Sequence, residues 1–171
     1  MMKNLLFFVL LIFVAGNSFG QDDEKASTLT KIGQDVPSFS FAQDNGQLLK
    51  IADYKGKVVL LNFFATWCGP CMLEMPKVES LLWQPLKTDK FMILAFGRKH
   101  SREEMDAFKK VKGFTFPIFP DPQASIYNLF ASKYIPRNIV INKEGKIVFQ
   151  SVGYSEEEFQ KMVNIIKAQL K

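Results

Sequence analysis

The chain has 171 residues, 47% of them hydrophobic, and a formal net charge of +5 at pH 7. This length suits one domain with a substantial core, and the basic residues do not gather into the stripe that a nucleic-acid-binding surface requires. Two cysteines and one histidine are too few for a tetrahedral zinc site made of such ligands. We therefore expect no nucleic-acid partner and no structural zinc.

The N-terminus has the pattern of a secretory signal peptide. A basic start at 1–4 precedes an apolar stretch from Leu5 to Ala15, and the small residues Ser18 and Gly20 match a cut after Gly20. The apolar stretch is shorter than the roughly 20 residues that span a bilayer. We expect export to an oxidising space such as the periplasm, with an uncleaved membrane anchor as the alternative.

The next segments predict a linker, a hairpin and a buried strand. Residues 21–29 form a polar run typical of a flexible linker. Apolar and polar residues alternate at 39–41, and the chain resumes this pattern at 48–51 after the turn signal Asp44-Asn45-Gly46, which predicts a β-hairpin. The run at 57–64 is nearly all apolar after its first residue, and it predicts a strand buried on both faces.

The only two cysteines follow that strand, as Cys68 and Cys71. With two residues between them, their sulfurs can meet across the first turn of a helix and switch between dithiol and disulfide. A helix N-terminus lowers the pKa of a thiol, so we assign Cys68 as the nucleophile and Cys71 as the resolving cysteine. Gly69 permits the bend before the helix, Pro70 suits its first turn, and Trp67 is expected beside the sulfurs, restricting access to them.

Two other roles for the cysteines remain open at this point. An inert disulfide is disfavoured, because a bridge that closes so short a loop removes little chain entropy. Copper(I) is harder to exclude, since two thiolates can hold it in linear geometry. A copper-binding, metal-delivery protein is therefore the alternative to a redox enzyme.

The remaining pattern predicts alternating strands and helices. A helix is expected from about residue 71 to 82, with Pro76 kinking it, and the apolar run 91–96 predicts a second buried strand. The alternation of strands and helices along the chain, ending in a hairpin and a helix, predicts a mixed sheet with helices on both faces. The further elements expected are a helix capped by Ser101 and Glu104, an extended segment at 114–119, a helix from Asp121 to about Lys133, a hairpin of 139–141 with 146–152, and a last helix capped by Ser155.

Around the cysteines the chain resembles the thioredoxin superfamily, and more closely its extracytoplasmic TlpA/ResA-type thiol:disulfide oxidoreductases. The resemblance rests on residues 62–71, 74–76 and 135–147 and covers roughly 30–171. It implies a thioredoxin-like three-layer α/β/α fold with a mixed central sheet and an added N-terminal β-hairpin. The expected division is 1–20 signal peptide, 21–29 flexible linker and 30–171 thioredoxin-like domain.

The resemblance also assigns a substrate-binding loop. It makes Pro136 the cis-proline that faces the sulfurs, with the backbone of Ile135 pairing with an extended substrate segment by β-augmentation. An ordinary trans turn proline is the alternative. Tyr134 and Arg137 flank this loop, where contact with a partner and a solvated surface are equally open.

A third catalytic residue is implied at Glu74, which matches the glutamate of ResA-like proteins. A desolvated carboxyl group there would have a raised pKa and could take the proton from Cys71 as it attacks. Asn62 stands where cytoplasmic thioredoxins have a buried aspartate, and it cannot exchange a proton. The alternative for Glu74 is a solvated residue near a helix N-terminus.

Together these features predict a thiol:disulfide oxidoreductase without cofactor or stable metal. The Gly-Pro dipeptide between the cysteines favours reduction, as in thioredoxin with its potential of about −270 mV. By resemblance we expect disulfide-containing exported proteins as substrates, apocytochrome c being one candidate, and a transmembrane thiol reductase as electron donor. An oxidase or isomerase stays open, whereas a peroxiredoxin-like peroxidase is disfavoured because Ala65 replaces the family's threonine. We expect His100, just before a helix cap, to be solvated and non-catalytic.

Overall fold

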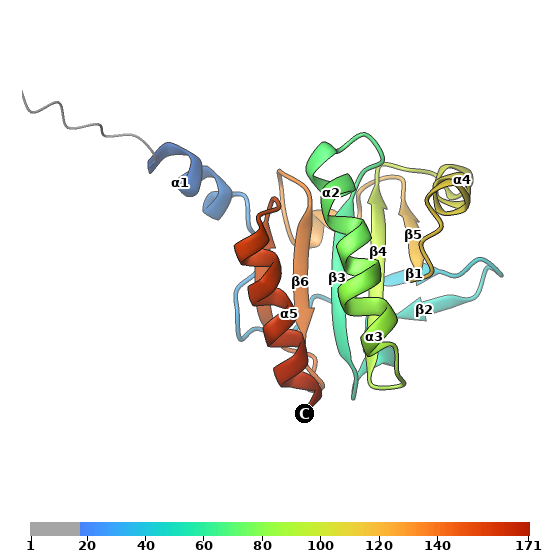
Figure 1. Ribbon diagram of the computed structural model, residues 1–171. Coiled ribbons are helices and arrows are strands. Elements are labelled where there is room, and N and C mark those ends of the chain that lie inside the picture. Colours follow the sequence, from blue (N-terminus) through green and yellow to red (C-terminus); the bar gives the residue numbers. More distant parts are fainter. Residues whose placement is uncertain (1–17) are drawn as a thin grey trace, which may run out of the picture.

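The computed structural model describes residues 18–171, so that most of the predicted signal peptide lies outside the described residues (Figure 1). Its central sheet has five strands in the order β5-β4-β3-β6-β7. These strands are β3 (Val58–Phe64), β4 (Phe91–Arg98), β5 (Ile118–Asp121), β6 (Arg137–Ile141) and β7 (Ile147–Val152). Strand β3 is parallel to β4 and antiparallel to β6, which confirms the predicted mixed sheet.

Strand β3 is the middle strand of the sheet, and all seven of its residues are buried. Its side chains alternate between two apolar clusters, one on each face of the sheet. Leu60 and Phe64 belong to one cluster, and Leu61 and Phe63 to the other. Asn62 is the single polar residue in this strand, so the sequence places one polar group inside an otherwise apolar layer.

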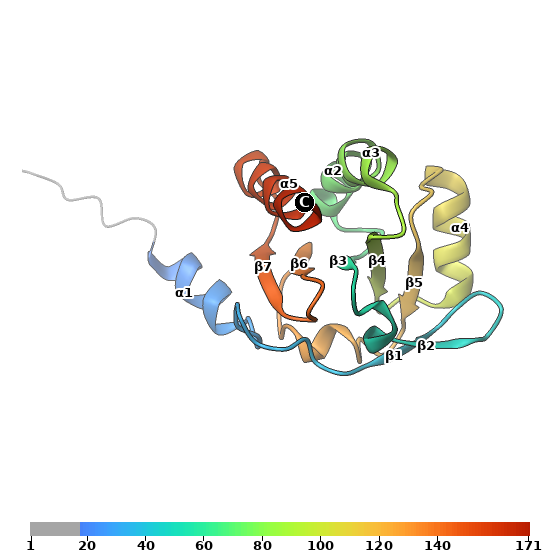
Figure 2. The same ribbon diagram turned by 90° about the horizontal axis from the view of Figure 1, so that it is seen from below.

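Most of the helices pack on the first of these faces (Figure 2). Helix α4 runs beside β5, while α2 and α5 cover the middle of the sheet and the β6–β7 side (Figure 2). The predicted caps are present, since Ser101 and Glu104 form a capping box and Ser155 caps the last helix. These elements are α2 (Gly69–Lys77), η2 (Val78–Trp83), α3 (Gln84–Leu86), α4 (Arg102–Lys112) and α5 (Glu156–Leu170).

The helix after the cysteines differs from the predicted one at both ends. It begins at Gly69, because Cys68 itself is the N-cap, and it continues to Leu86. Pro76 lies inside α2, and the π-helical segment η2 begins two residues later. A proline removes one backbone hydrogen bond of a helix, and a wider π-turn is one way to accommodate that loss without ending the helix.

The opposite face is covered by short elements (Figure 2). The predicted hairpin is confirmed as an antiparallel pair, in which Phe41 lies opposite Leu49. Phe39 and Phe41 both pack edge-on against Phe96 of the central sheet, which attaches the hairpin to the core. The elements on this face are β1 (Ser40–Ala42), β2 (Leu48–Lys50), η1 (Ile51–Tyr54) and η3 (Tyr127–Leu129).

The prediction of a helix from Asp121 to Lys133 is wrong, because only the short 3-10 helix η3 forms there. The buried Asp121 carboxylate accepts hydrogen bonds from the backbone N–H groups of Ile126 at 3.2 Å and Tyr127 at 2.9 Å. Ala124 has a positive φ of 53°. An aspartate that bonds the following backbone competes with a helix, and here it folds the segment into a turn.

The flexible linker expected at 21–29 is replaced by helix α1 (Ser18–Ala26) and a segment that joins the domain. Beyond α1, the Leu29 N–H donates to the Phe130 carbonyl at 2.9 Å, and Thr28 forms a β-bridge with Ala131. This segment is therefore attached to the loop that leads into β6. No helix among residues 18–171 is both long and apolar enough to cross a membrane.

Candidate active site

Cys68 and Cys71 form a disulfide at the N-terminal end of α2, with their Cα atoms 5.3 Å apart. Cys68 is the N-cap of that helix, and its Sγ accepts a hydrogen bond from the Cys71 N–H at 3.3 Å. This donor and the positive end of the helix dipole favour a thiolate on Cys68 after reduction. Cys71 is fully buried, whereas Cys68 keeps 5% exposure. The geometry thus suits Cys68 for attack on an external disulfide.

Cys68 opens into a surface groove of about 370 Å³. The groove brings together most of the residues predicted to bind substrate, and it adds Arg98 and Tyr134. Trp67 lines the groove beside Cys68, and its own side chain is 71% exposed. The lining residues are Trp67, Cys68, Gly69, Pro70, Arg98, Tyr134 and Ile135.

The predicted substrate-binding loop forms the wall opposite the disulfide. The Ile135–Pro136 peptide is cis, as the resemblance implies. The Ile135 carbonyl oxygen lies 3.8 Å from Cys68 Sγ. A backbone held this close to the disulfide can align an extended peptide across it.

Glu74 is buried, with only 1% exposure, so the solvated alternative is wrong. It lies three residues after Cys71 on α2, where side chains share one face of a helix. Asn62 Nδ2 donates to its carboxylate at 3.0 Å, and Asn138 Nδ2 donates to the other oxygen at 2.5 Å. Burial raises the pKa of Glu74 to about 7, although the two amide hydrogen bonds act in the opposite direction.

Asn138 is a site residue that the sequence reasoning missed. It lies directly opposite Asn62 in the β3–β6 pairing, and Asn62 Nδ2 also donates to its Oδ1 at 2.8 Å. The register of two strands far apart in sequence creates this triad of Glu74, Asn62 and Asn138. The only sequence signal is a polar residue in the second position after the cis-proline, directly before the apolar run 139–141.

Arg137 is neither solvated nor facing a partner, so both expectations for it are wrong. It is buried, and its guanidinium donates to the Lys133 carbonyl, to Ser27 Oγ at 2.6 Å and to Thr28 Oγ1 at 2.8 Å. The segment after α1 supplies two of these acceptors, which explains why the arginine is directed away from solvent. Arg137 therefore fixes the cis-proline loop from behind.

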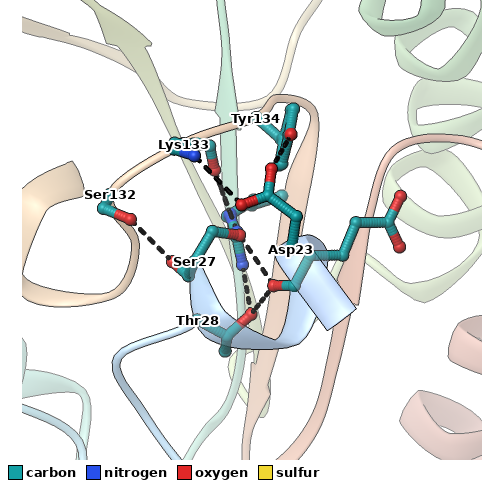
Figure 3. A network of polar contacts seen from close by, with 8 residues as sticks. Asp23, Ser27, Thr28, Ser132, Lys133 and Tyr134 are labelled. Carbon is teal, nitrogen blue, oxygen red and sulfur yellow. Dashed lines mark hydrogen bonds and ion pairs between the residues drawn. The ribbon is translucent and has the colours of Figure 1, made fainter. Parts of the chain in front are cut away.

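Helix α1 contacts the same loop, as Figure 3 shows. Asp23 accepts hydrogen bonds from the Tyr134 hydroxyl and, at 3.0 Å, from Lys133 Nζ. The Ser132 N–H donates to the Ser27 carbonyl at 2.9 Å. Since Tyr134 also lines the groove, these contacts connect α1 with the wall of the site.

His100 is buried, so the prediction that it is solvated is wrong. Its Nε2 lies 3.1 Å from the Thr66 backbone N, and its Nδ1 lies 3.3 Å from Glu104 Oε2. The Thr66 N–H can donate only to an unprotonated Nε2, which places the ring proton on Nδ1, facing Glu104. His100 thus supports the backbone of the loop that carries Trp67 and Cys68.

These features meet the needs of thiol–disulfide exchange: an accessible sulfur at a helix N-terminus, a buried partner sulfur and a backbone edge for the substrate. With the fold, they define a class, the thioredoxin-like thiol–disulfide oxidoreductases. Within that class the chain belongs to the Redoxin family, whose model matches residues 31–170. Among residues 18–171, no three His, Cys, Asp or Glu side chains are grouped so that they could hold a metal ion.

Named relatives agree with this class. The chain is 30% identical over 167 residues to the thiol-disulfide oxidoreductase ResA of Bacillus thuringiensis (strain Al Hakam). The match covers 92% of this chain and 94% of the relative. A solution structure of a candidate protein disulfide isomerase from Bacteroides thetaiotaomicron matches with a TM-score of 0.79 and 36% identity, over 84% of this chain and 92% of that one. A crystal structure of a candidate thiol:disulfide interchange protein DsbE from Chlorobium tepidum matches with a TM-score of 0.70 and 27% identity, over 82% and 99% of the two chains.

Proposed function

We propose that the chain reduces disulfides of exported proteins through a dithiol–disulfide cycle of Cys68 and Cys71. The observation that carries this proposal is the position of the pair: Cys68 lies in a groove at a helix N-terminus, and Cys71 is buried behind it. The relatives named as oxidoreductases favour this function over copper delivery and over peroxide reduction. The groove beside the cis-proline loop suits an extended polypeptide.

In the reducing direction, the Cys68 thiolate attacks one sulfur of the substrate disulfide. That bond breaks, a mixed disulfide with Cys68 forms, and the departing substrate sulfur leaves as a thiolate that takes up a proton. The Cys71 thiol then loses its proton and attacks Cys68 Sγ, which forms the Cys68–Cys71 disulfide and releases the second substrate sulfur as a thiolate. Two electrons pass from the dithiol to the substrate.

Glu74 is proposed as the base for the second attack. Because its pKa is raised to about 7, a large fraction of its carboxyl groups is ionised near neutral pH and can accept a proton from Cys71. The same group can return that proton to the departing substrate thiolate. Its place one turn along α2 from Cys71, buried away from solvent, supports a role in this local transfer.

The proposed compartment and partners follow from the N-terminus and the relatives. The pattern of residues 1–20 supports a cleaved signal peptide and a periplasmic location, with an uncleaved anchor as the alternative. An enzyme that reduces in an oxidising space needs a supply of electrons, for which we propose a transmembrane thiol reductase. Exported proteins with disulfides are the proposed substrates, and apocytochrome c is one candidate.

The test is to trap the intermediate. Reduced Cys71→Ser protein is mixed with insulin, and a stable mixed disulfide through Cys68 is expected, because the resolving thiol is missing. Wild-type protein should reduce insulin repeatedly when dithiothreitol supplies the electrons. If Cys68→Ser protein reduces insulin as fast as the wild type, the cysteine cycle is wrong. Mass spectrometry of the adduct shows which sulfur is joined to insulin.

A further inference from the structure

Among the described residues that line the groove, Arg98 is the one charged residue. It is the last residue of β4, and this end of the strand lies next to the loop that carries Trp67 and Cys68, called the redox loop below. The neighbours that share the groove are the exposed Trp67, the sulfur-bearing Cys68 and the cis-proline loop. A positively charged guanidinium therefore lies in the same groove as Cys68.

Within residues 18–171 the guanidinium of Arg98 has no anionic partner. No ion pair or side-chain hydrogen bond of Arg98 is formed within residues 18–171, and its buried Nε lacks any acceptor there. Its register partner on β5 is Asp121, but that carboxylate is occupied by the backbone N–H groups of Ile126 and Tyr127. A half-buried guanidinium without an acceptor has lost hydration that a ligand could replace.

The surroundings hold this cation in place for a ligand. The Arg98 guanidinium carbon lies 4.6 Å from the centre of the Tyr127 ring, a cation–π contact that restrains the guanidinium. The Tyr127 hydroxyl donates to the Tyr134 carbonyl at 2.9 Å, and Asp23 holds the Tyr134 hydroxyl (Figure 3). Both the cation and the wall opposite it are thus fixed before a substrate binds, which lowers the entropic cost of binding.

We propose that Arg98 is a specificity residue that binds the carboxylate of an aspartate or glutamate next to the half-cystine of the substrate. This inference rests on the proposed function and names the substrate class more closely. Arginine offers a planar fork of donors that a carboxylate matches, and no acidic residue of the groove competes for it. An extended peptide that crosses Cys68 along Ile135 brings its side chains next to the half-cystine within reach of this wall.

The test uses two synthetic disulfide-bridged peptides that differ only in glutamate or glutamine beside one half-cystine. The pre-reduced full chain is mixed with each, and the rate constant of Cys68–Cys71 disulfide formation is measured. We expect the glutamate peptide to react about fivefold faster at low salt, the effect of one half-exposed charge-assisted pair, and the ratio to fall toward one as salt increases. Arg98→Gln should lose the preference, while the adjacent exposed Lys99→Gln, outside the groove, should keep it.

The outcomes separate this inference from the proposed function. Equal rates for the two peptides with wild-type protein, or a preference that survives in Arg98→Gln, would overturn the role of Arg98. A uniform slowing of both peptides in Arg98→Gln, with a raised thiol pKa of Cys68, would overturn it too, since Arg98 would then act on the thiolate. If Arg98→Gln does not fold, the salt dependence of the wild-type ratio decides alone. Failure to reduce either peptide would instead contradict the proposed function.

Discussion

At the scale of single residues, Glu74 shows how burial changes the pKa of an ordinary side chain. A glutamate titrates near 4.3 in water, but removal from solvent disfavours its charge, and the pKa of Glu74 rises to about 7. Asn62 and Asn138 oppose this shift by donating to both carboxylate oxygens. The two amide donors stabilise the Glu74 carboxylate, so that it is populated near neutral pH, where a general base works best.

Replacement of Glu74 by glutamine should slow the attack of Cys71 and remove its dependence on this pKa. Below about pH 7 the wild-type carboxyl group is mostly protonated and cannot accept a proton, so the wild-type rate should rise with pH through 7 and then level off. Glu74→Gln should lack that step, and its rate at pH 7.5 should be lower by about 100-fold. The measurement is the single-turnover rate of peptide reduction across pH.

Glu157→Gln is the matched control, since Glu157 is an exposed glutamate on α5, away from the groove. Its pH profile should coincide with that of the wild type. A Glu74→Gln profile that keeps the step near pH 7 would show that another group is responsible for it.

At the scale of elements, the sequence predicts what depends on local pattern and misses what depends on register. The strand before Cys68, the capped helix at Ser101 and the hairpin at Asn45-Gly46 follow from periodicity and turn chemistry. The absence of a long helix after Asp121 could not be read in this way, because a buried side chain redirects the backbone there.

The same limit applies to the site. Cys68, Cys71, Glu74 and the cis peptide before Pro136 were expected from the motif and its resemblance, and the structure brings them together. Asn138 belongs to the site only through its pairing with Asn62 across two distant strands. His100 and Arg98 reach the redox loop because β4 ends beside it, a juxtaposition that exists only in the folded sheet.

Helix α1 offers an element-scale prediction, because it is bound to the loop before the cis-proline. Asp23→Asn should weaken the contacts with Tyr134 and Lys133 and let the groove wall move. We expect the KM for a peptide disulfide to rise about three-fold with little change in kcat, which is the loss of a modest charged hydrogen bond. The reduction potential should not change, because Asp23 does not touch the cysteines. Steady-state kinetics with dithiothreitol as donor, together with a redox titration, check both parts.

Asp22→Asn is the control for this prediction, since the neighbouring Asp22 is exposed and makes no side-chain hydrogen bond within the described chain. It removes the same charge without touching the loop. An equal rise of KM in both variants would attribute the effect to charge alone, and no rise in Asp23→Asn would show that α1 does not position the wall.

At the scale of the whole molecule, the sheet holds together a site whose parts are distant in sequence. Strand β3 leads into the cysteines, β6 follows the cis-proline, and their antiparallel pairing places the two loops at the same end of the sheet. Apolar clusters on both faces of β3 keep this arrangement rigid. A rigid scaffold of this kind holds the cis-proline loop and Cys68 Sγ in a fixed position relative to each other.

The direction of electron flow is the central claim, and the reduction potential of the Cys68–Cys71 pair tests it most directly. The purified full chain is equilibrated with defined ratios of reduced and oxidised dithiothreitol or glutathione, and the fraction of free thiols is read by alkylation and mass spectrometry. A potential of about −250 mV or lower is predicted, because a reductant must hold its electrons less tightly than the disulfides it reduces. A potential near about −120 mV would contradict the account and indicate an oxidase.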